Sequence, residues 1–172
     1  MIAYQHVLTI LIFMIPLFST GQNAPTIGAE APRIDITLQT GETVALADLY
    51  AKGPVLLYFY PKSFTPGCTQ QACDLRDNFA DLQKAELTVF GVSKDSVEKQ
   101  AKFKEEYALP FDLVADPEGL LGKAFKVGAM GGLVYRRQTV LIIEGKIAWF
   151  DPSAKPKTQT TDALAALEKL QK

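Results

Sequence analysis

The residues from Pro54 to Tyr60 form an uninterrupted apolar run of strand length, and Pro61 ends it. Such a run is typical of a strand buried on both faces, which requires a layer of helices on each side of the sheet. A second run of this kind covers 87–92, and residues 67–85 between the two runs carry apolar side chains at helical spacing. This order predicts a strand–helix–strand unit inside an α/β protein.

The rest of the chain extends this alternation of strands and helices. Alternating polar and apolar residues predict a strand over 33–38, and a turn at 40–42 returns the chain through 43–46. We also predict strands at 111–115, 139–143 and 146–150, helices at 47–50, 96–107, 116–125 and 160–170, and a glycine-rich loop at 128–132. We therefore expect a thioredoxin-like α/β fold, in which helices flank a central mixed sheet and an N-terminal β-hairpin extends it.

The first residues differ from the rest, because residues 1–21 contain no Asp, Glu, Lys or Arg. An apolar run at 7–18 followed by small residues resembles a secretory signal peptide that is cleaved before Gln22. The run is shorter than the roughly 20 residues of a spanning helix and contains Pro16, although an uncleaved membrane anchor remains the alternative. We expect an exported, periplasmic bacterial protein whose single domain covers 22–172.

Charge and histidine content limit the possible partners. The chain of 172 residues has 18 basic and 19 acidic side chains and a net charge of −1, whereas a nucleic-acid-binding surface needs a basic excess. His6 is the only histidine, so the predicted mature chain has none, and two cysteines alone make a weak metal site. We expect no nucleic-acid partner, no metal and no cofactor, and no Cys–His or Ser–His catalysis.

Cys68 lies where the chain leaves the first buried strand and enters the predicted helix. The amides of a first helical turn have no partners inside the helix, and together with the helix dipole they stabilise an anion. A cysteine at this position is expected to be partly ionised, and the thiolate is the nucleophilic form of the side chain. The alternative interpretation is a buried structural cysteine.

Cys73, the second cysteine, follows five residues later in the same predicted helix. In an intact helix this spacing separates the two side chains by about 140° of rotation and about 7.5 Å of rise. A disulfide needs Cα atoms within about 7 Å and converging Cβ atoms. The spacing therefore predicts a disulfide that forms only when the first turns unwind, with a permanent structural disulfide as the alternative.

A hydroxyl and a cation complete the candidate chemistry. Thr65 lies three residues before the first cysteine, and its hydroxyl could hold a substrate oxygen beside the sulfur or simply cap the helix. A guanidinium near the helix start would stabilise the ionised sulfur. The residues alone leave three candidates for it, Arg76, Arg136 and Arg137.

The pattern Pro61-x3-Thr65-x2-Cys68 resembles the active-site motif of peroxiredoxins. The longer run over 58–77 is similar to the Q-type subgroup, the bacterioferritin co-migratory proteins, although 128–135 departs from the usual pattern. The resemblance implies a thioredoxin-like fold and a thiol-dependent peroxidase that reduces hydrogen peroxide and organic hydroperoxides.

The resemblance also implies a role for each residue of the motif. It makes Cys68 the peroxidatic cysteine and Cys73 the resolving cysteine, which would form an intramolecular disulfide that a thioredoxin-like or other dithiol recycles. It makes Pro61 and Thr65 the conserved proline and threonine that bind the peroxide. Arg137 matches the catalytic arginine by its place before the strand at 139–143. We expect a monomer, because both cysteines lie in one chain.

Two other functions are compatible with this fold class. A thiol–disulfide oxidoreductase of the cell envelope would reduce protein disulfides without consuming peroxide, but such enzymes use a Cys-x-x-Cys pair that this chain lacks. A copper carrier of thioredoxin-like fold would bind metal stoichiometrically, and the missing histidine argues against it.

Overall fold

The computed structural model describes residues 24–172, so the predicted signal peptide lies outside the described residues. The elements follow in the order β1 (Asp35–Leu38), β2 (Thr43–Ala45), α1 (Leu46–Tyr50), β3 (Val55–Phe59), α2 (Pro66–Asp77), α3 (Phe79–Lys84), β4 (Thr88–Ser93), α4 (Val97–Glu106), β5 (Asp112–Ala115), α5 (Leu120–Ala124), β6 (Ala129–Met130), β7 (Val134–Tyr135), β8 (Gln138–Ile143), β9 (Lys146–Asp151) and α6 (Gln159–Leu170).

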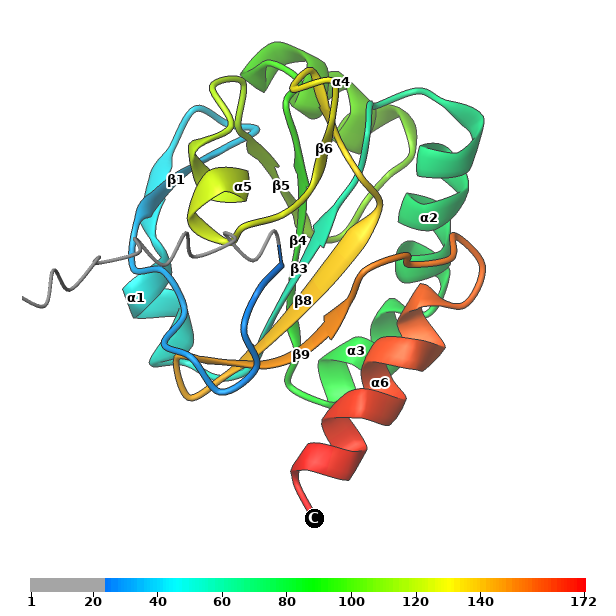
Figure 1. Cartoon of the computed structure of the whole chain (residues 1–172). Helices are drawn as coiled ribbons and strands as arrows, with labels where there is room; N and C mark the ends of the chain where they lie inside the picture. Colours follow the sequence, from blue (N-terminus) through cyan, green and yellow to red (C-terminus); the bar gives the residue numbers. More distant parts are fainter. Residues whose placement is uncertain (1–23) are drawn as a thin grey trace, which may run out of the picture.

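The main sheet has seven strands in the order β2-β1-β5-β4-β3-β8-β9 (Figure 1). The apolar strand β3 pairs in parallel with β4 and antiparallel with β8. On one side β4 pairs in parallel with β5, and on the other β8 forms an antiparallel hairpin with β9. The predicted mixed sheet, with β1 and β2 as its N-terminal hairpin, is therefore confirmed.

Helices cover both faces of the sheet, as the apolar run in β3 requires (Figure 1). Alternate side chains of β3 enter two separate cores. Val55, Leu57 and Phe59 pack in the core under α1 and α5, whereas Leu56 and Tyr58 pack in the core under α2, α3, α4 and α6. The second core contains Cys68, so the start of α2 is held by packing against the sheet.

The long helix predicted over 67–85 is interrupted at Asn78, which separates α2 from α3. The Asn78 side chain donates to the Asp74 carbonyl at 2.8 Å, and its backbone leaves the helical region at φ −107°, ψ 17°. Asparagine competes in this way with helical hydrogen bonding, which explains why apolar periodicity alone predicted a continuous helix.

The helix predicted to open at Asp116 begins later, at Leu120. Gly119 precedes it with φ +74°, a left-handed conformation that glycine adopts without strain. Asp116 is not the N-cap residue, but its carboxylate accepts hydrogen bonds from the Gly122 amide in the first turn of α5 at 3.1 Å and from the Tyr135 hydroxyl. Asp116 therefore ties α5 to β7.

The predicted loop at 128–132 contains a strand, because β6 pairs with β7 in a small antiparallel hairpin. Gly131 and Gly132 form its turn with φ +57° and +72°. Lys94 donates to the Gly132 carbonyl at 2.7 Å and fixes the turn against the end of β4. Strands of two residues carry no periodicity, so the sequence pattern could not reveal them.

The leading segment of the described chain covers the free edge of β9. The Gly28 amide donates to the Ile147 carbonyl, the Ile147 amide to the Ala29 carbonyl, and the Ala31 amide to the Gly145 carbonyl, all at 2.8–2.9 Å. Within residues 24–172, no helix has the length and apolar character needed to cross a membrane.

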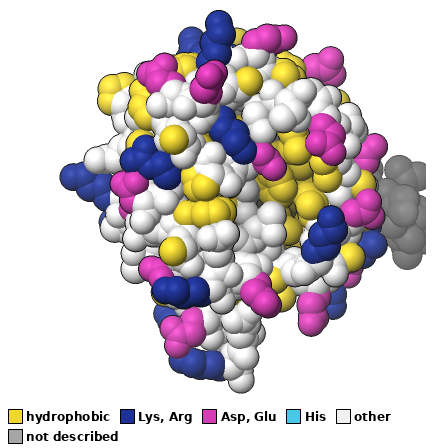
Figure 2. All heavy atoms as spheres, turned by 180° about the vertical axis from the view of Figure 1, so that it is seen from behind, with side chains coloured by type: hydrophobic (Ala, Val, Ile, Leu, Met, Phe, Trp, Pro, Cys, Tyr) yellow, Lys and Arg dark blue, Asp and Glu magenta, His cyan; other side chains and the backbone are white. Residues whose placement is uncertain are grey.

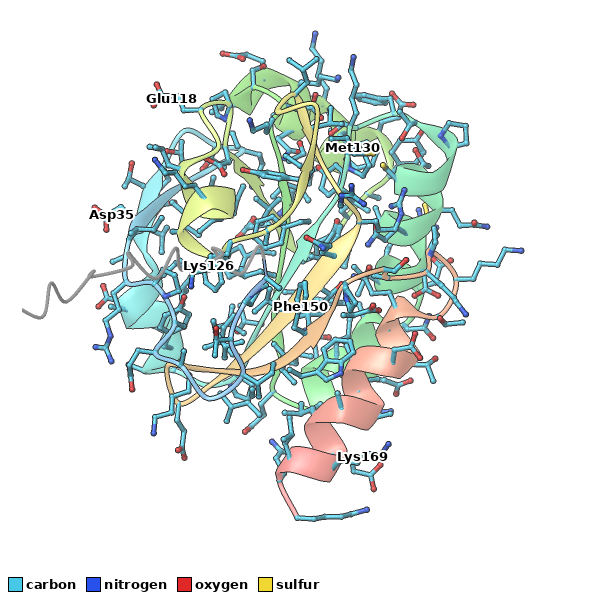
Figure 3. The ribbon with its side chains drawn as sticks, in the orientation of Figure 1. Asp35, Glu118, Lys126, Met130, Phe150 and Lys169 are labelled. Carbon is cyan, nitrogen blue, oxygen red and sulfur yellow. The ribbon has the colours of Figure 1, made fainter. Side chains whose placement is uncertain are left out.

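The surface carries charges of both signs. Figure 2 shows Lys and Arg interspersed with Asp and Glu over the face behind the view of Figure 1. In Figure 3, the exposed side chains of Asp35, Glu118 and Lys169 project outward, whereas apolar side chains fill the space between sheet and helices. This distribution fits the balanced net charge of −1.

Candidate active site

The site lies at the connection between the end of β3 and the start of α2. Thr65 is the N-cap of α2 with an extended backbone (φ −86°, ψ 146°), and Pro66 follows at a position where its missing N–H costs no helical bond. The amides of Cys68 and Thr69 both donate to the Thr65 carbonyl, at 3.1 and 2.9 Å. Cys68 thus lies in the first turn, as predicted, and its side chain is buried with 1% exposure.

Arg137 is the cation that reaches the sulfur. Its Nη2 lies 3.5 Å from the Cys68 Sγ, and the side chain is half-buried. Arg136 is exposed, and Arg76 instead pairs with Asp77. Of the three arginines that the sequence left open, the structure brings only Arg137 to Cys68.

Gly67 leaves space for the Arg137 guanidinium, and Gln71 holds it by a hydrogen bond. A Cβ on Gly67 would lie 3.1 Å from the Arg137 Nη2, so the absence of a side chain there lets the arginine approach the helix. Gln71, fully buried, accepts a hydrogen bond from the Arg137 Nη1 through its Oε1. Sequence reasoning missed Gln71, although its position three residues after Cys68 places both on one helix face.

The Thr65 hydroxyl does not cap α2. It donates to the Lys62 carbonyl at 3.0 Å, so its oxygen remains free to accept a hydrogen bond from another group. Pro61, the other predicted substrate-binding residue, is half-buried two residues after the end of β3. The structure thus keeps Thr65 and Pro61 on the loop that leads from β3 into α2.

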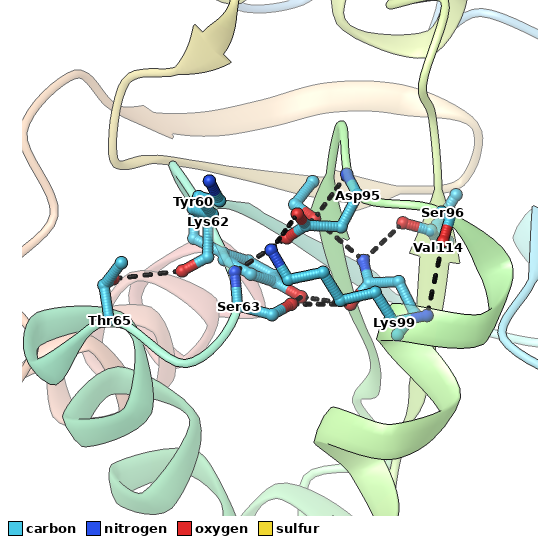
Figure 4. A network of polar contacts seen from close by, with 10 residues as sticks. Tyr60, Lys62, Ser63, Thr65, Asp95, Ser96, Lys99 and Val114 are labelled. Atoms are coloured by element: carbon cyan, nitrogen blue, oxygen red, sulfur yellow. Dashed lines mark hydrogen bonds and ion pairs between the residues drawn. The ribbon is translucent and has the colours of Figure 1, made fainter.

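The half-buried carboxylate of Asp95 anchors this loop (Figure 4). Asp95 accepts hydrogen bonds from the Ser63 amide at 2.7 Å, the Ser93 hydroxyl at 3.0 Å and the Lys99 ammonium at 2.7 Å. Burial alone would raise the pKa of Asp95, but these hydrogen bonds outweigh it and hold the pKa below its usual value. Nothing in the sequence pattern pointed to Asp95.

A second set of hydrogen bonds in the same network also holds the loop between β3 and α2. The Tyr60 hydroxyl donates to the Gln100 Oε1, and the Ser63 hydroxyl lies 3.2 Å from the Tyr60 hydroxyl. The Gln100 Nε2 donates to the Ser93 hydroxyl at 3.1 Å and to the Val114 carbonyl at 2.8 Å. The loop that carries Thr65 is thereby tied to β4, α4 and β5.

Cys73 lies in the same helix as Cys68, and both thiols are free. The two side chains do not come together in the intact helix, in agreement with the expected geometry. Cys73 is half-buried and lines an open surface groove. The other residues of this groove are Pro66, Thr69, Gln70, Asp74, Asp77 and Lys157.

Tyr58 lies fully buried beneath the helix that carries both cysteines. Burial raises its pKa well above the ordinary value, and negative charge at Tyr60, Cys68 or Cys73 would raise it further. The phenol is therefore neutral at physiological pH and does not serve as a base. Among residues 24–172, no three His, Cys, Asp or Glu side chains lie close enough to hold a metal ion.

A thioredoxin-like sheet with a cysteine in the first turn of a helix, set against a guanidinium, defines a thiol-based redox protein. Comparison with known proteins specifies the class. Residues 27–150 match the AhpC/TSA family. Peroxiredoxin Bcp of Bacillus subtilis is 41% identical over 149 residues, which cover 83% of this chain and 94% of that protein.

Two solved structures give the same result. Peroxidoxin BcpB from Mycobacterium tuberculosis superposes with a TM-score of 0.78 at 31% identity, over 84% of this chain and 97% of that one. The bacterioferritin comigratory protein of Xanthomonas campestris, described for its alkyl peroxide reduction activity, superposes with a TM-score of 0.77 at 30% identity, over 86% and 100%. The chain therefore belongs to the AhpC/TSA family, as a peroxiredoxin of the Bcp or Q type, and is a thiol peroxidase.

Proposed function

We propose that this peroxidase reduces hydrogen peroxide and organic hydroperoxides at Cys68 and recycles that sulfur through a disulfide with Cys73. The observation that carries the proposal is the Arg137 Nη2 at 3.5 Å from the Cys68 Sγ, at the first turn of α2. The positive end of the helix dipole and the guanidinium both stabilise negative charge that develops at this position during the reaction. The alkyl peroxide activity named for the similar Xanthomonas campestris protein supports organic hydroperoxides as substrates.

The first step oxidises the sulfur. The Cys68 thiolate attacks the terminal oxygen of the hydroperoxide, the S–O bond forms, and the O–O bond breaks. Cys68 becomes a sulfenic acid, and the departing oxygen takes a proton to leave as water or an alcohol. Arg137 stabilises the charge that develops on this oxygen, and the Thr65 hydroxyl, whose own proton goes to the Lys62 carbonyl, accepts from the peroxide O–H.

The second step joins the two sulfurs. The Cys73 thiol attacks the sulfenic sulfur of Cys68, the S–S bond forms, and the S–O bond breaks with release of water. Both cysteines lie in α2, where the helical geometry separates them, so the first turns must unwind before the step. An external dithiol of the thioredoxin type then reduces the disulfide and is itself oxidised.

The site of action follows from the N-terminal segment. We infer that residues 1–21 direct export to the periplasm and are removed there, so that the mature enzyme meets its peroxide and its reductant outside the cytosol. A monomer suffices for the proposed cycle, because both sulfurs belong to one chain.

One assay tests the cycle. The purified mature protein is mixed with limiting hydrogen peroxide and an excess of a dithiol, and peroxide consumption is compared with that of Cys68→Ser and Cys73→Ser. We expect no turnover for Cys68→Ser. We expect one rapid burst of sulfenic acid for Cys73→Ser, after which turnover depends on the external thiol. Equal activity in wild type and Cys68→Ser would rule out Cys68 as the peroxidatic residue.

A further inference from the structure

A chain of hydrogen bonds runs from the Cys68 sulfur to the first residue of α6. The Arg137 Nη2 contacts the Cys68 Sγ, and its Nη1 donates to the Gln71 Oε1. The Gln71 Nε2 in turn donates to the Oε1 of Gln159, which lies 88 positions away in the sequence. Both glutamines are buried, with 0% and 1% exposure.

The direction of each hydrogen bond in this chain is determined by the arginine. A guanidinium only donates, so Gln71 must face it with its oxygen and must turn its NH2 group away. That NH2 then needs an acceptor, which the oxygen of Gln159 supplies. A residue without an accepting oxygen at position 159 would leave the Gln71 amide unpaired or free to rotate.

Gln159 accepts the hydrogen bond from the Gln71 amide, but its own NH2 group has no acceptor in the described part of the chain. Its Nε2 is buried and has no hydrogen-bond partner among residues 24–172. A buried donor without a partner disfavours folding, and an apolar side chain at this position would introduce no such donor. Packing alone therefore does not account for a glutamine at the start of α6.

We propose that Gln159 is a positioning residue for peroxide reduction, acting through Gln71 to hold the Arg137 guanidinium against the Cys68 sulfur. Gln159 touches neither sulfur nor peroxide, so its effect on the reaction is indirect. The next residue makes a separate contact between the same two helices, because the Thr160 amide and hydroxyl donate to the Asp74 carboxylate of α2 at 3.2 and 2.7 Å. The inference rests on the proposed role of Arg137.

The test measures only the first step of the cycle, the oxidation of Cys68 by peroxide. In a Cys73→Ser background, the rate of Cys68 oxidation by hydrogen peroxide is measured by rapid-mixing capture of the sulfenic acid. We expect Gln159→Met and Gln71→Met each to slow this rate by about three- to tenfold. The double variant should be no slower than Gln71→Met alone, because both changes break one chain of contacts.

A matched control separates this effect from general loosening of the contact between α2 and α6. Thr160→Val removes a neighbouring hydrogen bond between these helices without touching the glutamines, and the first-step rate should remain at the wild-type value. A reduced rate for Thr160→Val equal to that of Gln159→Met would overturn the proposal, and so would additive effects of the two glutamine variants.

Arg137→Met distinguishes failure of this inference from failure of the proposed function. If Arg137→Met leaves the first step unchanged, the role proposed for the arginine is wrong. If Arg137→Met slows it while Gln159→Met stays within twofold of wild type, only the positioning role is wrong. If Gln159→Met fails to fold, Gln159→Glu takes its place, because this variant keeps the accepting oxygen. Gln159→Glu should retain the wild-type first-step rate, and a tenfold loss of that rate would overturn the proposal.

Discussion

At the scale of single residues, the site depends on how closely one guanidinium can approach one sulfur. The Arg137 side chain crosses the start of α2 directly above Gly67, where a Cβ would lie 3.1 Å from its Nη2. That separation is shorter than an ordinary contact, so even a methyl group would press against the guanidinium. The glycine contributes to the reaction because it leaves this space empty.

Gly67→Ala should therefore slow the reaction without harming the fold. The new methyl group displaces the Arg137 guanidinium by a few tenths of an ångström, and we expect the peroxide reaction of Cys68 to slow by roughly three- to tenfold. This is less than the hundredfold or greater effect of losing such a donor entirely. Alanine favours a helix over glycine by about 0.5–1 kcal/mol, so the melting temperature should not fall. Rapid-mixing kinetics and thermal melting measure the two effects.

The matched control is Gly128→Ala, whose methyl group would lie 3.0 Å from the exposed Arg136 side chain instead. That side chain can move aside into solvent, so the peroxide rate should stay at the wild-type value. Equal slowing in both variants would show that the space above Gly67 has no special role.

Local pattern identified some of these residues and could not identify others. Cys68 and Thr65 were predictable because a strand end, a Pro-Gly pair and a helix start are close in sequence. The choice between Arg136 and Arg137 depends on how β8 pairs with β3, a contact between residues far apart in the chain. Gln159 lies at the start of an ordinary amphipathic helix and carried no signal at all.

At the scale of elements, α2 must hold Cys68 for the first step and release it for the second. Its later turns are well fixed, because Leu75 is fully buried and the Arg76 Nη1 donates to the Tyr107 carbonyl at 2.9 Å. One residue before Leu75, the Asp74 carboxylate accepts hydrogen bonds from the Thr160 amide and hydroxyl of α6. We expect unwinding to run from Pro66 up to this contact, which opposes it.

Thr160→Val should accelerate disulfide formation. The substitution removes the hydroxyl bond to Asp74 and keeps the amide bond, which weakens the contact by about 0.5–1.5 kcal/mol. If this contact must loosen before Cys73 reaches Cys68, the resolving step speeds up by about two- to tenfold. Less Cys68 sulfinic acid should then accumulate at high peroxide, because the sulfenic acid is consumed sooner. Mass spectrometry after timed quenching measures both products.

Thr158→Val serves as the control for this prediction. The Thr158 hydroxyl, at the N-cap position of α6, donates to Asp162 of the same helix and not to α2, so the resolving rate should not change. Slower disulfide formation in Thr160→Val would mean that the contact guides Cys73 instead of restraining it.

The loop between β3 and α2 has its own anchor in Asp95, and its contribution to stability should depend on pH. The folded state lowers the pKa of Asp95 beneath the unfolded value of about 3.9, so the ionised form stabilises the fold above that pH. The contribution is lost as the pH falls through the lower folded-state pKa. Asp95→Asn should therefore reduce the free energy of unfolding by about 1–3 kcal/mol at pH 7, and by less at pH 3.

Urea unfolding of both proteins at the two pH values measures this difference. Asp81→Asn is the control, because its ion pair with Lys84 is exposed and contributes little at either pH. A gap between wild type and Asp95→Asn that widens on acidification would contradict the assigned sign.

At the scale of the whole molecule, the alternation of buried strands and helices was enough to predict a layered α/β fold, because a strand apolar on both faces has few other solutions. The hairpin of β6 and β7 and the break at Asn78 escaped prediction, since each depends on a few local hydrogen bonds and not on periodicity. These deviations leave the sheet order and the position of Cys68 unchanged. The core pattern therefore determines the architecture, and side-chain bonds determine where elements end.

The N-terminal boundary of the fold lies in the segment that packs beside β9. Residues 28–31 make three backbone hydrogen bonds to β9 and the turn before it, and Ala31 is buried, so the fold needs this segment. A chain covering 22–172 should thus match the full chain in unfolding free energy and peroxide rate. A chain covering 32–172 should lose about 3 kcal/mol, at roughly 1 kcal/mol for each lost bond. Urea unfolding compares the three proteins, and a chain covering 22–172 that is as unstable as the shorter one would place the boundary of the domain within the first 21 residues.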